Sequence, residues 1–100
     1  MRVVTPKRLI DFSKKHSKAK IPLLHWYEVV KNANWNSIND IKKDFNSVDY
    51  VGNNRYVFNI KGNDYRLVAI VILVSNKIYI RFIGTHSEYD KLTAESIKKI

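Results

Sequence analysis

The residues best suited to chemistry lie in the second half of the chain, in and just after a run of strand-forming residues. They are arginines, a histidine, a tyrosine and a lysine: Arg55, Arg66, Arg81, His86, Tyr89 and Lys91. Arginine can hold a phosphate with two hydrogen bonds at once, histidine can give or take a proton near neutral pH, and tyrosine can stack on a base. This set suits metal-free cleavage of RNA. A base activates the ribose 2′-hydroxyl, an acid protonates the departing 5′-oxygen, and cations stabilise the charge on phosphorus.

Each of these residues also has a structural explanation. Arginines on an exposed sheet face often serve solubility alone, and a tyrosine near the end of a chain more often anchors packing. His86 could cap the turn after a strand, and Arg66 could brace the C-terminal segment. The residue types therefore permit nuclease chemistry without establishing it.

No residue pattern indicates a metal or a cofactor. The chain has no cysteine, which excludes disulfides and thiolate metal sites. Its three histidines, His16, His25 and His86, are scattered, and no His and carboxylate spacing is typical of a zinc site. No glycine-rich phosphate loop precedes a helix, and no serine lies in a nucleophile elbow. We therefore expect no metal and no cofactor.

The elements that must position the chemical residues are three predicted strands of an antiparallel meander. Runs rich in Val, Ile, Tyr and Phe predict strands over 55–60, 65–74 and 77–83. Lys61-Gly62-Asn63-Asp64 supplies the first turn, because Gly and Asn tolerate positive φ. Ser75-Asn76 is predicted as a two-residue second turn.

These turns fix a predicted register and hence two faces of the sheet. The expected cross-strand pairs are Asn59 with Arg66, Arg55 with Ile70, Arg81 with Ile70, and Thr85 with Arg66. One face then carries Arg55, Asn59, Arg66, Tyr79 and Arg81, with His86 just beyond its edge. The other face is apolar and should meet helices; it carries Phe58, Ile60, Leu67, Ala69, Val71, Ile78, Ile80 and Phe82.

The N-terminal half predicts a short strand and three helices. Residues 2–4 can add a strand to the sheet. Thr5 is predicted as the N-cap of the first helix, with Pro6 as its first helical residue. Pro22 restarts a helix, and the two helices should form a hairpin on the sheet, surrounded by lysines that we interpret as a solvated face. Ser37 and Asp40 resemble a capping box for a helix over 38–45.

The remaining segments are short. Residues 45–54 are predicted as an irregular approach to the sheet that ends in a Gly52-Asn53-Asn54 turn. Residues 86–92 predict a helical turn, and Thr93 predicts the cap of a last turn that carries Ile97 and Ile100. We expect one α+β domain over residues 1–100, with an N-terminal helical hairpin packed on one face of a twisted antiparallel sheet.

The net charge of +9, from 18 Lys and Arg against 9 Asp and Glu, indicates an anionic partner. Nucleic acid is the first candidate and an acidic protein the second; a basic soluble protein without a nucleic-acid role is the plain alternative. Met1 is not followed by an apolar signal core, and the apolar run 67–74 is too short to span a bilayer. We expect a cytoplasmic protein with no membrane association.

The segment Arg55–Lys91 resembles the HigB-type toxins of bacterial type II toxin–antitoxin systems, within the RelE/ParE superfamily. The resemblance is carried by the segments 55–60, 62–63, 65–69, 84–86 and 88–90, which read RYVFNI, GN, YRLVA, GTH and EYD. It implies a RelE-like fold and metal-independent, ribosome-dependent endonucleolytic cleavage of mRNA. It also implies a cognate antitoxin, HigA-type with a helix-turn-helix domain, through which alone the pair contacts operator DNA.

The resemblance also implies roles for particular residues. Arg66 matches the sheet arginine of the family, and His86 with Tyr89 match polar residues near its C-terminus. Arg66 would hold the scissile phosphate, His86 would act as general acid or base, Tyr89 would stack or assist proton transfer, and Lys91 would stabilise charge. Contacts to the RNA or ribosome backbone are assigned to Arg55, Lys61, Lys77 and Arg81. Which group is the base stays open, as do two alternatives: a gyrase-inhibiting toxin of the same fold, and a non-catalytic basic binding module.

Overall fold

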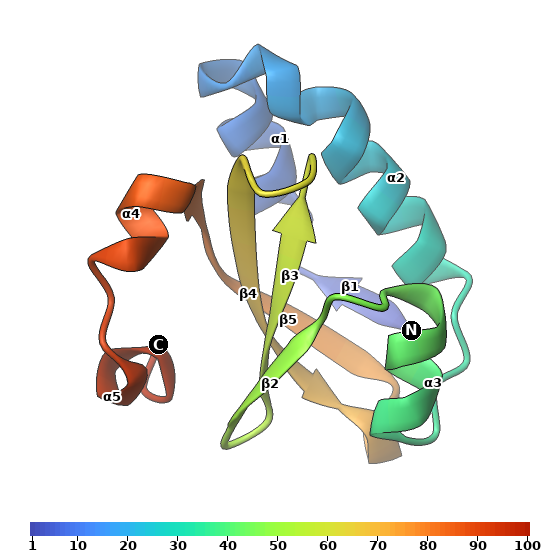
Figure 1. Cartoon of the computed structure of the whole chain (residues 1–100). Helices are drawn as coiled ribbons and strands as arrows, with labels where there is room; N and C mark the ends of the chain where they lie inside the picture. Colours follow the sequence, from blue (N-terminus) through green and yellow to red (C-terminus); the bar gives the residue numbers. More distant parts are fainter.

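Five strands form one twisted sheet in the computed structural model, which describes residues 1–100 (Figure 1). The strands are β1 (Arg2–Val4), β2 (Asp49–Gly52), β3 (Arg55–Ile60), β4 (Tyr65–Ile72) and β5 (Lys77–Thr85). Their order across the sheet is β1-β5-β4-β3-β2. Only β1 runs parallel to its neighbour β5, so the sheet is mostly antiparallel, as predicted.

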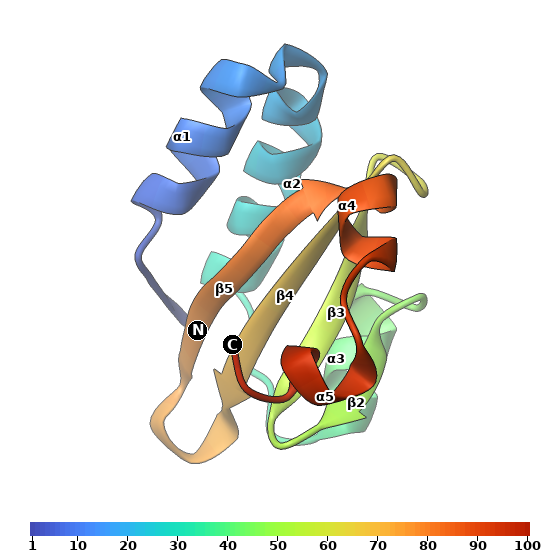
Figure 2. The ribbon, with the colours of Figure 1, turned by 90° about the vertical axis from the view of Figure 1, so that its left-hand side faces the viewer.

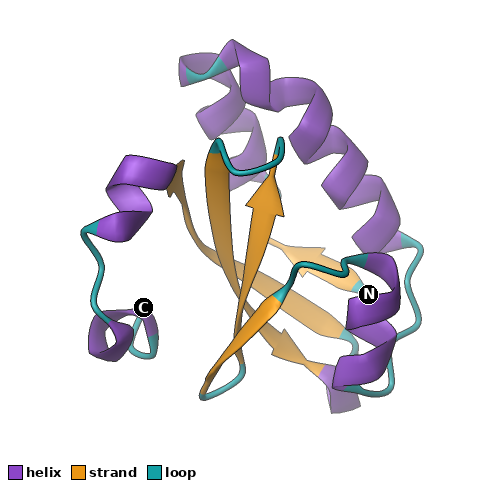
Figure 3. Cartoon of the chain, in the orientation of Figure 1, coloured by secondary structure: helices purple, strands orange, loops and turns teal.

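Helices lie on both faces of this sheet (Figure 3). They are α1 (Lys7–Lys15), α2 (Lys20–Lys31), α3 (Ile38–Asp44), α4 (His86–Asp90) and α5 (Ala94–Ile97), with a 3-10 turn at Ser17–Ala19 between α1 and α2. The hairpin of α1 and α2 covers one face together with α3, which confirms the predicted α+β class. The short α4 and α5 lie over the other face (Figure 2).

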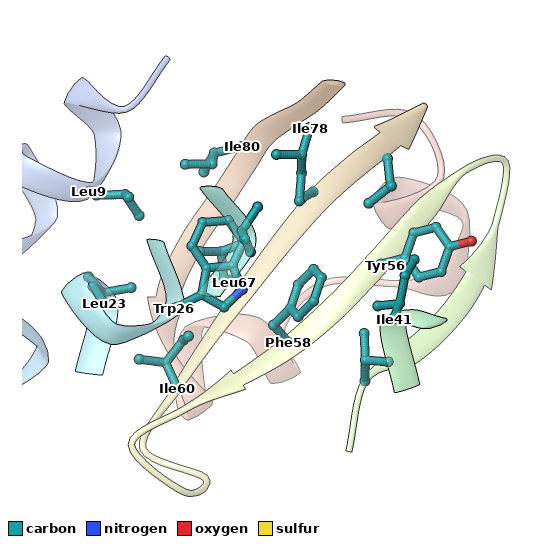
Figure 4. Close-up of a cluster of buried hydrophobic side chains, with 14 of the residues drawn as sticks. Leu9, Leu23, Trp26, Ile41, Tyr56, Phe58, Ile60, Leu67, Ile78 and Ile80 are labelled. Atoms are coloured by element: carbon teal, nitrogen blue, oxygen red, sulfur yellow. The ribbon is translucent and has the colours of Figure 1, made fainter. Parts of the chain in front are cut away.

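The core lies between the sheet and the N-terminal helices (Figure 4). Seven of the eight residues predicted for the apolar face point into it: Phe58, Ile60, Leu67, Ala69, Val71, Ile78 and Ile80. From α2, Leu23, Trp26 and Val30 pack against them, and the Trp26 ring meets the Phe58 ring edge-on at 5.5 Å. Close packing of this kind fixes how the sheet and the helical hairpin lie relative to each other.

The first hairpin has the predicted register. Ile60 pairs with Tyr65 across the four-residue turn, which places Asn59 opposite Arg66. Lys61 and Gly62 both adopt positive φ, 53° and 64°. The glycine marked this turn in the sequence, and the position of Arg66 follows from it.

The loop between β4 and β5 is longer than predicted. The strands close on Ile72 and Lys77, so four residues connect them instead of two. Leu73–Ser75 form a 3-10 turn that ends at Asn76 in the left-handed conformation, with φ 54°. The prediction of a two-residue turn was therefore wrong, and the pairing moves by two residues.

This shift places Tyr79, not Arg81, opposite Ile70. Arg81 instead becomes the extra residue of a β-bulge. The pairs flanking the bulge are Val68 with Phe82 and Ala69 with Ile80. The side chain of Arg81 is exposed at this irregularity.

The bulge also changes the neighbours of Arg66. The longer loop alone would place Ile83 opposite Arg66, and the extra residue of the bulge makes the partner Gly84, where Thr85 was predicted. The bulge also turns the Phe82 side chain onto the sheet face that carries Arg66, although the sequence pattern predicts it on the helix-facing side. Ile83 packs against the main core instead. The predicted location of Phe82 was wrong for this reason.

Chain entry into the first two helices also differs from the prediction. Thr5 has φ 64°, and Pro6 is the N-cap of α1 without a side-chain hydrogen bond, so Thr5 is not the cap. Pro22 lies within the first turn of α2, where a missing N–H costs no helical hydrogen bond.

Three predicted turns or caps in the remaining segments are confirmed in whole or in part. Ser37 caps α3, because its hydroxyl accepts from the Asp40 main-chain N–H. The Asp40 carboxylate accepts from the Asn36 N–H and not from that of Ser37, so the capping box is not reciprocal. Thr93 caps α5 as predicted, and the turn over 52–54 is confirmed by positive φ at all three residues. The strand β2 was missed within the segment predicted as irregular.

A second apolar cluster holds the C-terminal helices on the sheet. Ile97 of α5 packs on Val57 and Val68, which point to the face opposite the main core. Arg55 strengthens this contact, because its Nε and Nη2 donate to the main-chain oxygen of Ile100 at 3.2 and 2.7 Å. The face of Arg66 is therefore partly covered and is open mainly near α4.

Candidate functional site

The candidate site forms where β5 ends and α4 begins. Thr85 and Glu88 make a reciprocal capping box: the Thr85 hydroxyl accepts from the Glu88 N–H at 3.2 Å, and the Glu88 carboxylate accepts from the Thr85 N–H at 2.8 Å. The latter bond lowers the pKa of Glu88. The His86 N–H donates to the Asp64 carbonyl at 3.0 Å. The start of α4 is thereby tied to the β3–β4 turn beside Arg66.

Arg66 lies at the second position of β4, partly exposed on the face that carries α4. Its guanidinium carbon is 5.8 Å from the centroid of the Tyr89 ring, within cation–π range. Its Nη1 donates to the Asn63 side-chain oxygen at 3.4 Å, a long bond. These contacts leave much of the planar guanidinium available to an anion.

Gly84, opposite Arg66, makes room for the Phe82 ring. A Cβ at this position would lie 2.6 Å from Cζ of Phe82, so the Phe82 ring occupies the space that a side chain would need. Phe82 and Tyr89 both pack against the second apolar cluster. Arg66 is therefore bordered by two aromatic residues and by a strand position without a side chain.

Tyr89 keeps its phenolic proton at neutral pH. Burial raises the pKa of Tyr89 above its ordinary value of 10.0, the nearby Arg66 cation acts in the opposite direction, and Asp49 and Asp90 add to the rise. The hydroxyl can therefore donate a hydrogen bond or a proton, while the ring contacts Arg66.

His86 forms a pair that we did not predict. Its Nδ1 lies 2.8 Å from Oδ2 of Asp90, one helical turn later, and the two side chains are 46% and 58% exposed. With the carboxylate accepting at Nδ1, the Nε2 atom of His86 is the ring nitrogen left for proton transfer. The four-residue spacing of His86 and Asp90 in a predicted helix was the signal that could have revealed the pair.

His16 also lies near the site, although it comes from the end of α1. Its ring stacks on Phe12 at 4.4 Å and meets Tyr65 at 5.8 Å, as expected for a packing residue. Its charge is close enough to contribute to the lowered pKa of Glu88. This proximity depends on how α1 packs on the sheet, so no sequence pattern indicates it.

Two lysines lie at the rim of the site. Lys91 is exposed at the C-cap of α4, and its charge also contributes to the lowered pKa of Glu88. Lys61 lies in the β3–β4 turn and pairs with Asp64 at 3.0 Å, and this hydrogen bond raises the pKa of Lys61.

The other three predicted contact residues are not brought close to Arg66. Lys77 begins β5 beside Arg2, seven residues before Gly84, which is about 23 Å along a strand. Arg55 uses its guanidinium to hold the main-chain oxygens of Asn53 and Ile100. Arg81 is exposed at the bulge, where its carbonyl accepts from the Arg8 side chain at 3.0 Å.

The arrangement suits phosphodiester chemistry. Arg66 offers a planar cation, Tyr89 a proton donor and an aromatic ring, and His86 an imidazole whose Nε2 can give or accept a proton. His86 follows the cross-strand neighbour of Arg66 by two residues, so the chain brings both residues to this end of the sheet.

Two further observations concern metals and membranes. The structure contains no group of three or more His, Asp or Glu side chains that could hold a metal ion. None of its helices combines the length and the apolar character needed to cross a membrane.

Comparisons with known proteins show the family to which the chain belongs. Residues 19–92 match the model of the HigB toxin family, described as the RelE-like toxic component of a toxin–antitoxin system. The chain is 36% identical over 97 residues to the mRNA interferase toxin HigB of Escherichia coli K12, covering 94% of this chain and 92% of that protein. It is 25% identical over 95 residues to the mRNA interferase HigB of Escherichia coli O6:H1, covering 93% and 92%. The chain therefore belongs to the HigB family of RelE-like toxins, the toxic components of toxin–antitoxin systems.

Proposed function

We propose that this chain is an mRNA interferase that cuts messages endonucleolytically on the ribosome, without a metal, and so inhibits translation. The observation that carries the proposal is the grouping of Arg66, Tyr89 and the His86–Asp90 pair at one end of the sheet. The relatives named as mRNA interferases and the net charge of +9 support it.

In this proposal Arg66 holds the scissile phosphate and stabilises the charge that builds on it. His86 acts through Nε2 as general acid or base, while Asp90 keeps Nδ1 occupied. Tyr89 stacks on the substrate or gives a proton, since its raised pKa keeps it protonated. Lys91 adds positive charge from the C-cap of α4.

The proposed contacts to the RNA or ribosome backbone divide by location. Lys61 and Arg81 are exposed, and Lys61 lies in the turn next to the site. Lys77 lies at the far end of β5, where it can contact only a distant part of a long substrate. Arg55 would have to contact RNA with a guanidinium group that already donates hydrogen bonds to the C-terminal segment.

Membership of the family implies a cognate antitoxin. We further propose that this antitoxin carries a helix-turn-helix domain of the HigA type and that the toxin meets operator DNA only through it. Cleavage on ribosomes would place the toxin in the cytoplasm.

The test is cleavage of a defined message by purified protein, with and without ribosomes and with EDTA. We expect cuts within the reading frame that need ribosomes, survive EDTA and disappear in Arg66→Ala. Intact messages together with relaxed DNA in cells would instead favour a gyrase-directed toxin. Binding of RNA without any cleavage would favour the alternative that the chain is a non-catalytic basic binding module.

A further inference from the structure

A small pocket lies between α1 and the outer edge of β5, with a volume of about 210 Å³. Its lining residues are Arg8, Asp11, Phe12, Lys15 and Ile83. The strand β1 pairs with β5 only over Lys77–Tyr79. Beyond that point no strand covers this edge, and α1 lies beside it, which leaves the room for the pocket.

The pocket carries positive charge that no acidic side chain neutralises. Arg8 donates through Nη1 to the carbonyl of Arg81 at 3.0 Å, and its other N–H groups have no partner. Lys15 is exposed and makes no ion pair, and neither does Asp11, the single acidic residue of the pocket. The exposed side chain of Arg81 adds a further cation at the bulge. The pocket therefore favours an anion.

The apolar part of the pocket includes an aromatic ring that its neighbours hold in place. The ring of Phe12 stacks on His16 at 4.4 Å and meets the ring of Tyr65 edge-on at 5.6 Å. Sites for single-stranded nucleic acid combine cationic side chains with aromatic rings on which bases stack. The pocket is smaller than the roughly 300–1,000 Å³ of sites that enclose small molecules. It therefore suits one part of a long chain better than a free nucleotide.

The pocket lies beside the candidate site. Its residue Ile83 precedes Gly84, which lies opposite Arg66. The helix α1 ends at the same end of the sheet, where His16 meets Tyr65. In Figure 2, β5 passes α1 before it ends at α4. An RNA strand that leaves the site along α1 would therefore pass over the pocket.

We propose that this pocket binds a phosphate of the message other than the scissile one. Lys15 and Arg8 contact that phosphate, and Phe12 contacts a base next to it. The inference rests on the proposed function, because it takes the message to be held at Arg66. A second point of attachment fixes the direction in which the strand crosses the site. Asp11 opposes the phosphate and so lowers the affinity.

The experiment measures binding, without cleavage, to ribosomes programmed with a defined message. Deoxynucleotides across the codon in the decoding site remove the attacking 2′-hydroxyl. In a set of such messages, the phosphates of this codon and of its two neighbours are replaced one at a time by uncharged methylphosphonate. Lys15→Gln is compared with Lys14→Gln, because Lys14 is the neighbouring lysine but lines a different groove, between α1 and α2.

Lys15→Gln should weaken binding by about three- to tenfold and reduce the slope of log affinity against log salt by about 0.7. On one methylphosphonate message it should have no further effect, because the contact is already lost. Arg66→Ala should show the same behaviour at a different phosphate, and Lys14→Gln should show it at none. Asp11→Asn should strengthen binding by about two- to fivefold.

Three results would overturn the proposal. An equal effect of Lys15→Gln on every message would assign this lysine to ribosomal RNA. Unchanged binding to ribosomes, together with weaker binding of the antitoxin, would assign the pocket to the antitoxin. Loss of the effects of Lys15→Gln and Arg66→Ala at the same phosphate would make the pocket part of the catalytic site. Melting curves like that of the wild type would show that the variants fold.

The same measurements separate failure of this inference from failure of the proposed function. A wild-type protein that binds no programmed ribosome would contradict both. Binding that Arg66→Ala weakens at one particular phosphate, while Lys15→Gln has no such dependence, would contradict the role of the pocket and leave the proposed function standing.

Discussion

His86 and Asp90 face each other across one turn of α4, with Nδ1 of the imidazole 2.8 Å from Oδ2 of the carboxylate. The pair is about half exposed, so its interaction energy is at most about 1 kcal/mol. An interaction of this size can hold the imidazole ring in one orientation, but it cannot take over the chemical role of the ring. Asp90 is therefore a positioning residue for His86 in the proposed mechanism.

Asp90→Asn should lower the single-turnover cleavage rate by about two- to fivefold, as expected from losing an exposed pair of this energy. The KM should not change, because Asp90 does not touch the substrate. Adding Asp90→Asn to His86→Ala should have no further effect, since the ring it positions is then gone. If the two losses multiply in the double variant, Asp90 acts independently of His86.

Tyrosine ionisation should limit stability at high pH. Burial raises the pKa of both Tyr56 and Tyr89, so the folded state keeps phenolic protons that the unfolded chain loses above about pH 10. Unfolding then releases protons, and the free energy of unfolding falls as pH rises past 10. Tyr89→Phe should make this decline shallower in urea denaturation measured at several pH values. An unchanged slope would show that Tyr89 titrates normally.

Arg55 should matter for stability more than for RNA binding. Arg55→Ala removes the hydrogen bonds to Ile100 and Asn53 and should lower the free energy of unfolding by about 1–3 kcal/mol. Arg81→Ala is the matched control, because its exposed side chain makes no hydrogen bond in the structure. Chemical denaturation of both variants decides this, and equal stabilities would refute the anchoring role of Arg55.

The sequence allowed prediction of the position of Arg66 but not of everything around it. Gly62 marked the first turn, and the pairing of Asn59 with Arg66 followed from it. The second loop had no glycine, and its left-handed residue is Asn76, so its length was misjudged. Nothing in the sequence marks the bulge at Arg81, where the pairing of β4 with β5 shifts by one residue.

The same contrast holds within the site. Family resemblance indicated Arg66, His86 and Tyr89 without showing their contacts, and the 5.8 Å approach of Tyr89 to Arg66 depends on how the C-terminal helices dock. Their docking rests on Ile97 and Arg55, which contact partners more than 25 residues away in the chain. Such long-range contacts leave no periodic pattern for sequence reasoning to detect.

Binding to ribosomes should depend steeply on salt, because each neutralised phosphate releases counterions. Lys61→Glu and Arg81→Glu should each weaken binding and reduce the slope of log affinity against log salt by about 0.7–0.9. Lys43→Glu, on exposed α3 away from the site, is the control. Affinity that barely changes between low and physiological salt would argue against phosphate contacts by these residues.

The last prediction separates the roles of Arg66 and His86 from structural ones. Arg66→Ala should remove the stabilisation of charge on the phosphate, and Arg66→Lys should restore activity only in part, because lysine lacks the planar fork. His86→Ala should slow single-turnover cleavage by about 10²–10⁴-fold if His86 is the acid or base. Both side chains are at least partly exposed, so neither change should alter the melting temperature much. The Asp64 carbonyl accepts from the main-chain N–H of His86, and alanine keeps that bond. Loss of activity with an unchanged melting curve therefore assigns His86 to chemistry. Full activity of His86→Ala would exclude it as the essential acid or base, and a collapsed melting curve would assign it to the structure of the β5–α4 junction.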